Sequence, residues 1–309
     1  MVESPIMAES PIPLVCILGP TAAGKTRLAA HVAAAANGEV VSADSRQIYR
    51  HMNIGTGKDL EDYTVHGLTV RSHLIDIVDP GYEYNLYEFK RDCIAAIREI
   101  HSRGRLPVLC GGTGLYLSAV LQNYQLLSVP PDPTRRAELE TIPTEQLIAE
   151  LRSHGPLHNT SDVQERKRLI RAIEIAEADP STRAPSIALD SRVFGIRWER
   201  RDLQKRITQR LAYRLDHGLL EEVRALLDRG LTDDQLIFYG LEYRYVTEHL
   251  RGDISHEQMV AALGTAIHQF AKRQDTWFRR MERKGVEIHW LDGRDSPEAN
   301  AEKALGLAF

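Results

Sequence analysis

One eight-residue segment, GPTAAGKT at 19–26, constrains the fold of this chain more than any other. It matches the P-loop pattern of a glycine, four residues and then Gly-Lys-Thr, in which backbone N–H groups and a helix N-terminus bind phosphate oxygens. The apolar run 13–18 predicts a buried strand before the loop, and 25–36 predicts a helix after it. The alternative is a glycine turn with a surface lysine. We assign the diphosphate- or nucleotide-binding role to Gly19, Pro20, Thr21, Ala22, Ala23, Gly24, Lys25 and Thr26.

Short apolar runs alternate with stretches of helical spacing along most of the chain. This alternation predicts βαβ units and an α/β fold, a P-loop NTPase-like parallel sheet flanked by helices. The expected strands are 13–18, 39–43, 72–78, 106–110, 193–198 and 287–291. The expected helices are 25–36, 85–103, 201–229, 233–250 and 255–283.

The alternation of short apolar runs and helical stretches stops after about residue 124. The proline-rich segment 129–133 is a rigid, non-helical connection, the following stretch is polar and helical, and 179–185 forms another break. We therefore expect a small helical insert, 129–190, between the two parts of the core, 1–128 and 191–309, the second of which carries the C-terminal helices.

Composition excludes several classes of protein. The 309 residues carry a formal net charge of −4, so any nucleic-acid partner must be bound by a local patch. No apolar run approaches the ~20 residues that span a bilayer. The first residues lack the features of a signal peptide, and Cys16, Cys93 and Cys110 lack the spacing of a disulfide framework or zinc site. We expect a soluble, cytoplasmic protein with buried, reduced cysteines.

Polar residues follow two of the predicted strands. Asp44 comes directly after 39–43, and ligands of doubly wound sheets bind beyond the carboxyl ends of strands. Its carboxylate is therefore a candidate to take a proton from an attacking group; a helix N-cap is the equal alternative. The glycine-rich turn 111–116, GGTGLY, follows another strand and would let a ligand approach closely.

Signals of nucleotide hydrolysis are weak. Asp76 and Asp79, in HLIDIVDP, are the nearest candidates for a Walker B aspartate, but their spacing is irregular, and no Asn-Lys-x-Asp motif occurs. A P-loop binds a diphosphate-like group, and the rest of the site decides the chemistry.

Positive charge is concentrated in two segments. Residues 164–214 hold 13 Lys or Arg against 7 Asp or Glu, and 271–280 mixes cations with aromatic rings. Such surfaces suit a phosphate backbone and unstacked bases. A solvated helix face is the alternative for both segments.

Together these motifs resemble the tRNA dimethylallyltransferase family, also called tRNA isopentenyltransferases, of the bacterial type. The resemblance runs from about residue 13 to residue 292. The segments that carry it are GPTAAGKT at 19–26, VSADSRQIYRHMNIGTGK at 41–58, HLID at 73–76, GGTGLY at 111–116, KRLIRAIEI at 167–175 and AKRQDTWFR at 271–279.

The resemblance implies the reaction and its residues. A dimethylallyl group would move from dimethylallyl diphosphate to the exocyclic N6 amine of the adenosine 3′-adjacent to the anticodon, with Mg²⁺ as cofactor and Thr26 as its ligand. The catalytic residues would be Asp44 as general base, Thr21 at the leaving oxygen and Arg210 on the diphosphate. The tRNA anticodon stem-loop would contact Asp44, Ser45, Arg46, Gln47, Thr113, Lys167, Arg168, Leu169, Ile170 and Arg171. We expect a monomer.

The sequence departs from the family pattern in three places. Gly57-Lys58-Asp59 replaces Ala-Lys-Pro, Glu242 replaces a glycine before Tyr-Arg, and no zinc finger extends the C-terminus. Three other functions stay open at this point. They are a P-loop kinase of small metabolites or nucleosides, a prenyltransferase of free adenine nucleotides, and a nucleic-acid-binding NTPase switch.

Overall fold

The chain divides into two compact units. The computed structural model describes residues 10–130, 132–155, 163, 165–178 and 184–308. One unit comprises Met1–Tyr124 and Ile187–Phe309, and the other is Gln125–Ser186. The bounds of the second unit lie four residues before those expected for the insert, 129–190. Gln164 and most of the expected break at 179–185 lie outside the described residues.

The first unit is built on a parallel sheet, which confirms the predicted α/β class. Its strand order is β5-β2-β6-β1-β7-β8, and every neighbouring pair is parallel. The strands are β1 (Ile12–Leu18), β2 (Gly38–Ser42), β5 (Ser72–His73), β6 (Leu106–Gly111), β7 (Leu189–Arg197) and β8 (Ile288–Asp292). A small antiparallel pair, β3 (Thr64–Val65) and β4 (Leu68–Thr69), follows the 3₁₀ helix η1 (Leu60–Tyr63).

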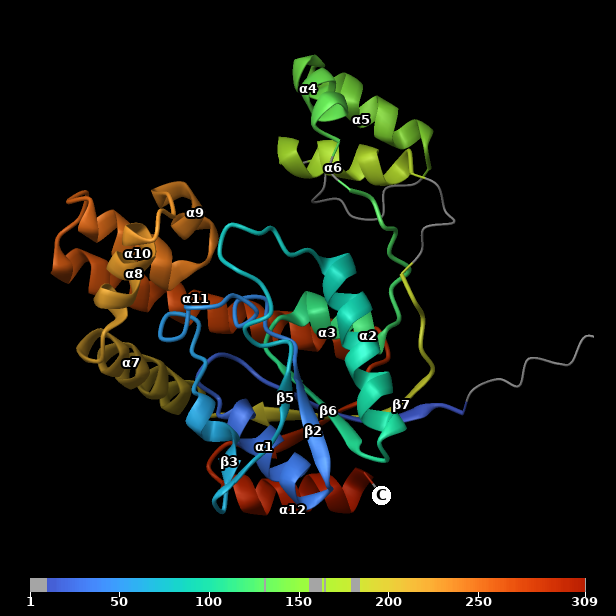
Figure 1. The fold of residues 1–309 in the computed structure, drawn as a ribbon, viewed down its shortest axis with the longest axis vertical. Helices are drawn as coiled ribbons and strands as arrows, with labels where there is room; N and C mark the ends of the chain where they lie inside the picture. Colours follow the sequence, from blue (N-terminus) through green and yellow to red (C-terminus); the bar gives the residue numbers. More distant parts are fainter. Residues whose placement is uncertain (1–9, 131, 156–162, 164, 179–183, 309) are drawn as a thin grey trace, which may run out of the picture. The chain divides into compact units, whose positions relative to one another are not determined.

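Helices cover both faces of this sheet (Figure 1). Alternate side chains of β1 enter different cores, because successive residues of a strand point to opposite faces. One core joins the sheet to α2 (Leu86–Ser102), α3 (Gly114–Leu121) and α11 (His256–Arg283). The other joins it to α1 (Lys25–Ala35) and to α12 (Pro297–Ala308), a helix that the sequence analysis did not predict.

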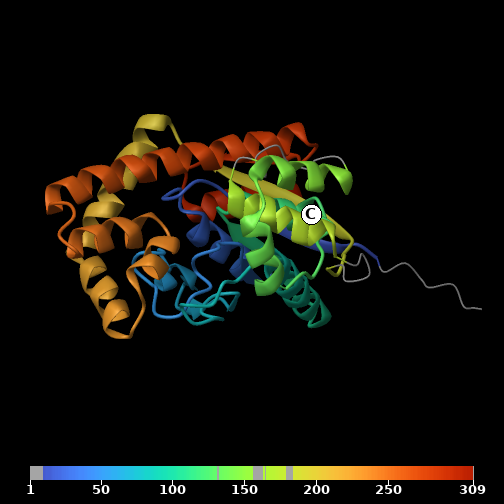
Figure 2. The same ribbon diagram turned by 90° about the horizontal axis from the view of Figure 1, so that it is seen from above.

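The helices after β7 are shorter than predicted. The expected helix 201–229 is two helices, α7 (Arg200–Asp216) and α8 (Leu219–Asp228), and 233–250 is α9 (Asp233–Phe238) and α10 (Leu241–Leu250). Gly218 and Gly240 separate them with φ of 98° and 130°, outside helical geometry. Helices α8 to α10 enclose a core of their own with Ile48, Tyr49 and Met52. Figure 2 shows the long α11 running beside these helices.

The third strand was also predicted too long. Only Ser72–His73 of the expected strand 72–78 pairs with β2. Leu74 and Asp76 have φ of 61° and 55°, which ends the extended conformation and frees the segment after β5 to turn.

The second unit is a helical bundle. Helices α4 (Pro133–Thr141), α5 (Thr144–Ser153) and α6 (Arg166–Ala176) pack around buried Leu139, Leu147 and Ile173. The Asp132 carboxylate accepts hydrogen bonds from the first backbone N–H groups of α4, as expected of an N-cap.

Two predictions from composition can be compared with the fold. None of the helices in the described ranges has both the length and the apolarity to cross a membrane. All three cysteines are buried free thiols, as predicted.

Candidate active site

A cavity of about 1120 Å³ lies within the first unit, beyond the carboxyl ends of β1, β2 and β6. Its walls include the P-loop, the turn after β2, the glycine-rich turn after β6 and one side of α7. These segments are far apart in the sequence, and parallel strands bring them to the same edge of the sheet. The cavity is lined by all three residues that were assigned catalytic roles from the sequence, Thr21, Asp44 and Arg210.

The P-loop lines the cavity. Gly24 precedes α1 with a φ of 90°, so the loop enters the helix through a left-handed residue. Burial lowers the pKa of Lys25, whose Nζ donates to the Pro20 carbonyl at 3.3 Å. The free N–H groups at the start of α1 and this lysine make the loop a site for phosphate oxygens.

Gln274, on α11, holds the P-loop against the glycine-rich turn. Its Oε1 accepts a hydrogen bond from Thr21 N at 2.8 Å, and its Nε2 donates to Gly112 O at 2.8 Å. The sequence analysis left two interpretations of the surrounding segment 271–280, a basic face that binds nucleic acid and a solvated helix face. Ala271, Gln274 and Phe278 are instead buried, so one face of this segment positions the site.

Asp44 lies at the cavity in a turn. Its Oδ1 accepts a hydrogen bond from Arg46 N at 2.9 Å, an Asx turn. The residues that follow are turns and a bridge, and no helix begins there. The N-cap alternative is therefore wrong, although the carboxylate does satisfy a backbone donor of its own turn.

The residues next to Asp44 divide into two groups. Ser45 N donates to Thr113 Oγ1 at 3.1 Å, which joins the turn after β2 to the turn after β6. The Arg46 guanidinium, which lines the cavity, lies 5.4 Å from the centre of the half-exposed Phe238 ring. Gln47 is only 8% exposed, and its amide donates to Gly57 O at 3.1 Å and accepts from Ser42. Gln47 thus supports the loop at Gly57, and because it also lines the cavity, its assignment as a tRNA contact stays a prediction.

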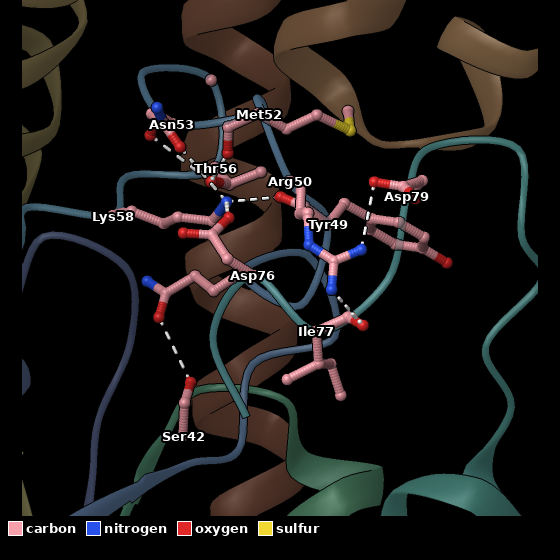
Figure 3. A network of polar contacts seen from close by, with 12 residues as sticks. Ser42, Tyr49, Arg50, Met52, Asn53, Thr56, Lys58, Asp76, Ile77 and Asp79 are labelled. Atoms are coloured by element: carbon pink, nitrogen blue, oxygen red, sulfur yellow. Dashed lines mark hydrogen bonds and ion pairs between the residues drawn. The ribbon is translucent and has the colours of Figure 1, made fainter. Parts of the chain in front are cut away.

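A buried lysine fixes the segment that leads to Gly57 (Figure 3). The Lys58 ammonium bonds to Asp76 Oδ1 at 2.5 Å, to Asn53 Oδ1 at 3.2 Å and to the Tyr49 carbonyl. Asp76, a weak Walker B candidate in the sequence, is thus an internal ion-pair partner. Glu222, from α8, anchors the same segment, since it accepts from the N–H groups of residues 53–55 at 2.7 to 2.9 Å.

Three arginines of α7, Arg206, Arg210 and Arg214, face the cavity at four-residue spacing. Arg206 donates from Nε to the P-loop carbonyl of Ala22 at 2.9 Å and stacks on Trp198. Burial lowers its pKa, and the nearby cations Arg27 and Arg210 lower it further. The crowding of positive charge suits a polyanion better than a neutral ligand.

The donor set fits Mg²⁺ only if phosphate oxygens complete its shell. Thr26 lines the cavity beside Lys25 and offers one hydroxyl. Across the ranges that the structure describes, no cluster of three or more His, Cys, Asp or Glu side chains could hold a metal by itself. This arrangement matches the way Mg²⁺ binds at P-loops, through one protein oxygen, waters and substrate phosphates.

The basic helix α6 lies in the second unit, and its side chains differ in accessibility. Lys167 and Arg168 are exposed. Leu169 and Ile170 are 0% and 3% exposed, in the core of the bundle, so we correct their assignment as tRNA contacts. Arg171 is half-buried and donates to the Val129 carbonyl at 2.7 Å, an internal role.

Comparisons with known proteins match most of the chain. The family described as IPP transferase matches residues 47–281, and the family described as isopentenyl transferase matches 12–76. A tRNA dimethylallyltransferase 2 of Syntrophotalea carbinolica is 54% identical over 288 residues, covering 92% of this chain and 95% of the relative. A tRNA dimethylallyltransferase 1 of Geotalea uraniireducens is 50% identical, covering 95% of this chain and 97% of the relative.

A solved structure has the same fold. The full-length tRNA isopentenylpyrophosphate transferase of Bacillus halodurans superimposes with a TM-score of 0.70 at 34% sequence identity. The match covers 96% of this chain and 95% of that chain.

Proposed function

The chain belongs to the tRNA dimethylallyltransferase family, and on that basis we propose how its site carries out the reaction. The enzyme transfers a dimethylallyl group from dimethylallyl diphosphate to tRNA. The acceptor is the exocyclic N6 amine of the adenosine on the 3′ side of the anticodon, and diphosphate is released. The observation that carries the proposal is the meeting of the P-loop, Asp44 and Arg210 in one cavity.

The diphosphate binds at the P-loop. The residues 19–26 supply backbone N–H donors, Lys25 and Arg210 supply positive charge, and Thr21 donates a hydrogen bond to the leaving oxygen. When the bond between the allylic carbon and this oxygen breaks, the electron pair stays on the diphosphate. Fixed donors stabilise the charge that develops there. Mg²⁺ bound by Thr26 and the phosphates would neutralise part of the same charge.

Asp44 is the general base. The exocyclic amine of adenine is a weak nucleophile, so removing its proton as the new N–C bond forms assists the attack. The proton moves to the Asp44 carboxylate. The adenine must leave its stack to reach the cavity, as in other enzymes that modify bases. Ser45, Arg46 and Thr113 lie beside Asp44 and contact the nucleotides around it.

Incubation with Mg²⁺, labelled dimethylallyl diphosphate and bulk tRNA, followed by nuclease digestion, tests the function. A labelled N6-prenyl adenosine next to the anticodon is the expected product. Label on free adenine nucleotides but not on tRNA would favour the nucleotide prenyltransferase. Phosphate transfer from ATP to a small alcohol, without prenyl transfer, would favour a kinase. Two further proposals are that the protein is a monomer and that it is cytoplasmic. Gel filtration tests the first, and cell fractionation tests the second.

A further inference from the structure

Two arginine–carboxylate pairs lie side by side in the wall of the cavity, and they differ in exposure. Arg214 pairs with Glu242 at 3.1 Å, and the two side chains are 9% and 18% exposed. Arg210 pairs with Asp59 at 2.5 Å, and these side chains are 27% and 43% exposed. Asp59 and Glu242 are two of the residues at which the sequence analysis noted a departure from the family pattern.

The two guanidinium groups crowd the same point of the backbone. A Cβ added at Gly57 would lie 2.4 Å from Arg210 Nη2 and 1.9 Å from Arg214 Nη2. Burial lowers the pKa of Arg214, and the charge of Arg210 lowers it further. Without a diphosphate, the two carboxylates balance this pair of like charges.

The backbone of the loop that leads to Asp59 is anchored by contacts with other parts of the unit. Glu222 accepts from the backbone of residues 53–55, and the buried Lys58 is bonded to Asp76 (Figure 3). Arg210, by contrast, is a long side chain on a helix surface, and it can turn from one partner to another by rotation about its own bonds.

We propose that Asp59 competes with the diphosphate for the guanidinium of Arg210. Asp59 pairs with Arg210 while the site is empty, is displaced when the diphosphate binds, and pairs with Arg210 again after the diphosphate is released. An ion pair that is this exposed is worth little and opens readily. A diphosphate offers more negative charge and two-point hydrogen bonding to the guanidinium, so it displaces Asp59 from Arg210. The buried Arg214–Glu242 pair stays closed and keeps the wall in place.

The exchange also selects among anions. A ligand must replace the attraction that Asp59 provides, and a single phosphate group brings less charge than a diphosphate. The free carboxylate then faces the bound diphosphate and speeds its departure. This inference rests on the proposed contact between Arg210 and the diphosphate.

Removing the charge of Asp59 tests the exchange. The Asp59→Asn variant should bind inorganic pyrophosphate about two- to fivefold more tightly, because the competing ion pair is lost. Orthophosphate should gain more than pyrophosphate, so the preference for pyrophosphate narrows. In steady state, KM for dimethylallyl diphosphate and kcat should both fall, because release becomes slower. Isothermal titration and rapid-quench kinetics measure these quantities, and Asp59→Glu should restore most of the parent behaviour.

Asp62→Asn is the matched control. Asp62 lines the same cavity as Asp59 but pairs with the exposed Arg27. The Asp62→Asn substitution therefore removes the same charge from the cavity without freeing Arg210. An equal gain in both variants would reduce the effect to bulk electrostatics and overturn the exchange. Weaker pyrophosphate binding by Asp59→Asn would also overturn it. Asp59→Ser provides a second variant if the asparagine fails to fold.

Arg210→Ala separates this inference from the function on which it rests. If Arg210→Ala leaves pyrophosphate affinity unchanged, the proposed diphosphate contact fails. If Arg210→Ala weakens binding but Asp59→Asn does not strengthen it, only the exchange fails. In the double variant, the Asp59 substitution should add no gain, because the effect passes through Arg210.

Discussion

The arginines of α7 and those of α6 are alike in sequence but differ in what they bind. On α7, the arginines face a cavity, where carboxylates or a P-loop carbonyl hold them at its surface. In the helical unit, Arg166 of α6 binds the carbonyls of Leu139, Glu140 and Ile142 at 2.7 to 3.0 Å, at the end of α4. It thus satisfies carbonyl groups that a helix C-terminus leaves without partners. A count of basic residues therefore overestimates the surface available to RNA.

The strongest test of this difference is a change that stops chemistry in the α/β unit alone. Asp44→Asn keeps the size of the side chain and its hydrogen bond to Arg46 N, but it cannot take a proton at neutral pH. Loss of a general base should slow prenyl transfer by ~10²–10⁴-fold in single turnover. Binding of donor and of tRNA, measured separately, should change much less. A rate within a few-fold of the parent would rule out Asp44 as the base.

The cations of the cavity should matter next. Lys25→Ala removes a charge-assisted contact to the diphosphate, which is worth roughly 1.5–3 kcal/mol. Titration with pyrophosphate and turnover at saturating tRNA measure the loss, and tRNA binding is the control. Parent-like donor affinity and turnover would remove the P-loop lysine from the mechanism.

The same lysine predicts a pH dependence. Burial places the pKa of Lys25 below that of an exposed lysine. The affinity for dimethylallyl diphosphate should be highest below this lowered pKa, where Lys25 is protonated. It should decrease as the pH rises through the pKa, because the neutral amine no longer attracts phosphate. A bound diphosphate raises the pKa again, so binding takes up a proton in that window. Titration in two buffers of different ionisation enthalpy detects the uptake, and Lys25→Met should abolish it.

The parts of the site that the sequence predicted are those made by contiguous residues at strand ends. The P-loop is a local motif, and Asp44 follows a strand whose carboxyl end meets the same sheet edge. Gln274 and Glu222 reach the site from 162 and about 170 residues away, and no periodicity encodes such a contact. The family segment AKRQDTWFR contains Gln274, but the cations in this segment are equally typical of an exposed basic face.

Other errors had signals in the sequence. Leu169, Ile170 and Ile173 repeat at helical spacing, which marks the buried side of α6. Gly218 interrupts the expected helix 201–229, and a glycine after His217 is typical of a helix end. The left-handed residues that end β5, Leu74 and Asp76, carry no such signal, because tertiary contacts impose their conformation.

The two roles of arginine within α6 can be separated by stability. Arg166→Ala removes the bonds to the end of α4 and should destabilise the helical unit by about 1–2 kcal/mol, since the side chain is a third exposed. The exposed Arg168→Ala should cost about 0.5 kcal/mol or less. Hydrogen exchange of the α4 and α6 amides in the full chain measures both. Equal protection in the two variants would mean that the carbonyl contacts of Arg166 contribute nothing.

The smallest expected effect concerns the exposed cations of α6. Lys167 and Arg168 are exposed on α6, and we expect them to contact the phosphate backbone of tRNA. Changing both to Gln leaves the buried side of the helix intact. The slope of log affinity for tRNA against log salt should flatten by up to ~0.7 per lost phosphate contact, on the single-strand estimate. Donor binding in the α/β unit should not change. Arg152→Gln is the control, since it removes an exposed charge of the same unit from a different helix, α5. If the double variant keeps the parent slope, Lys167 and Arg168 form only a solvated face. If Arg152→Gln flattens the slope as much per charge, the attraction is a general field of the unit rather than a contact made by α6.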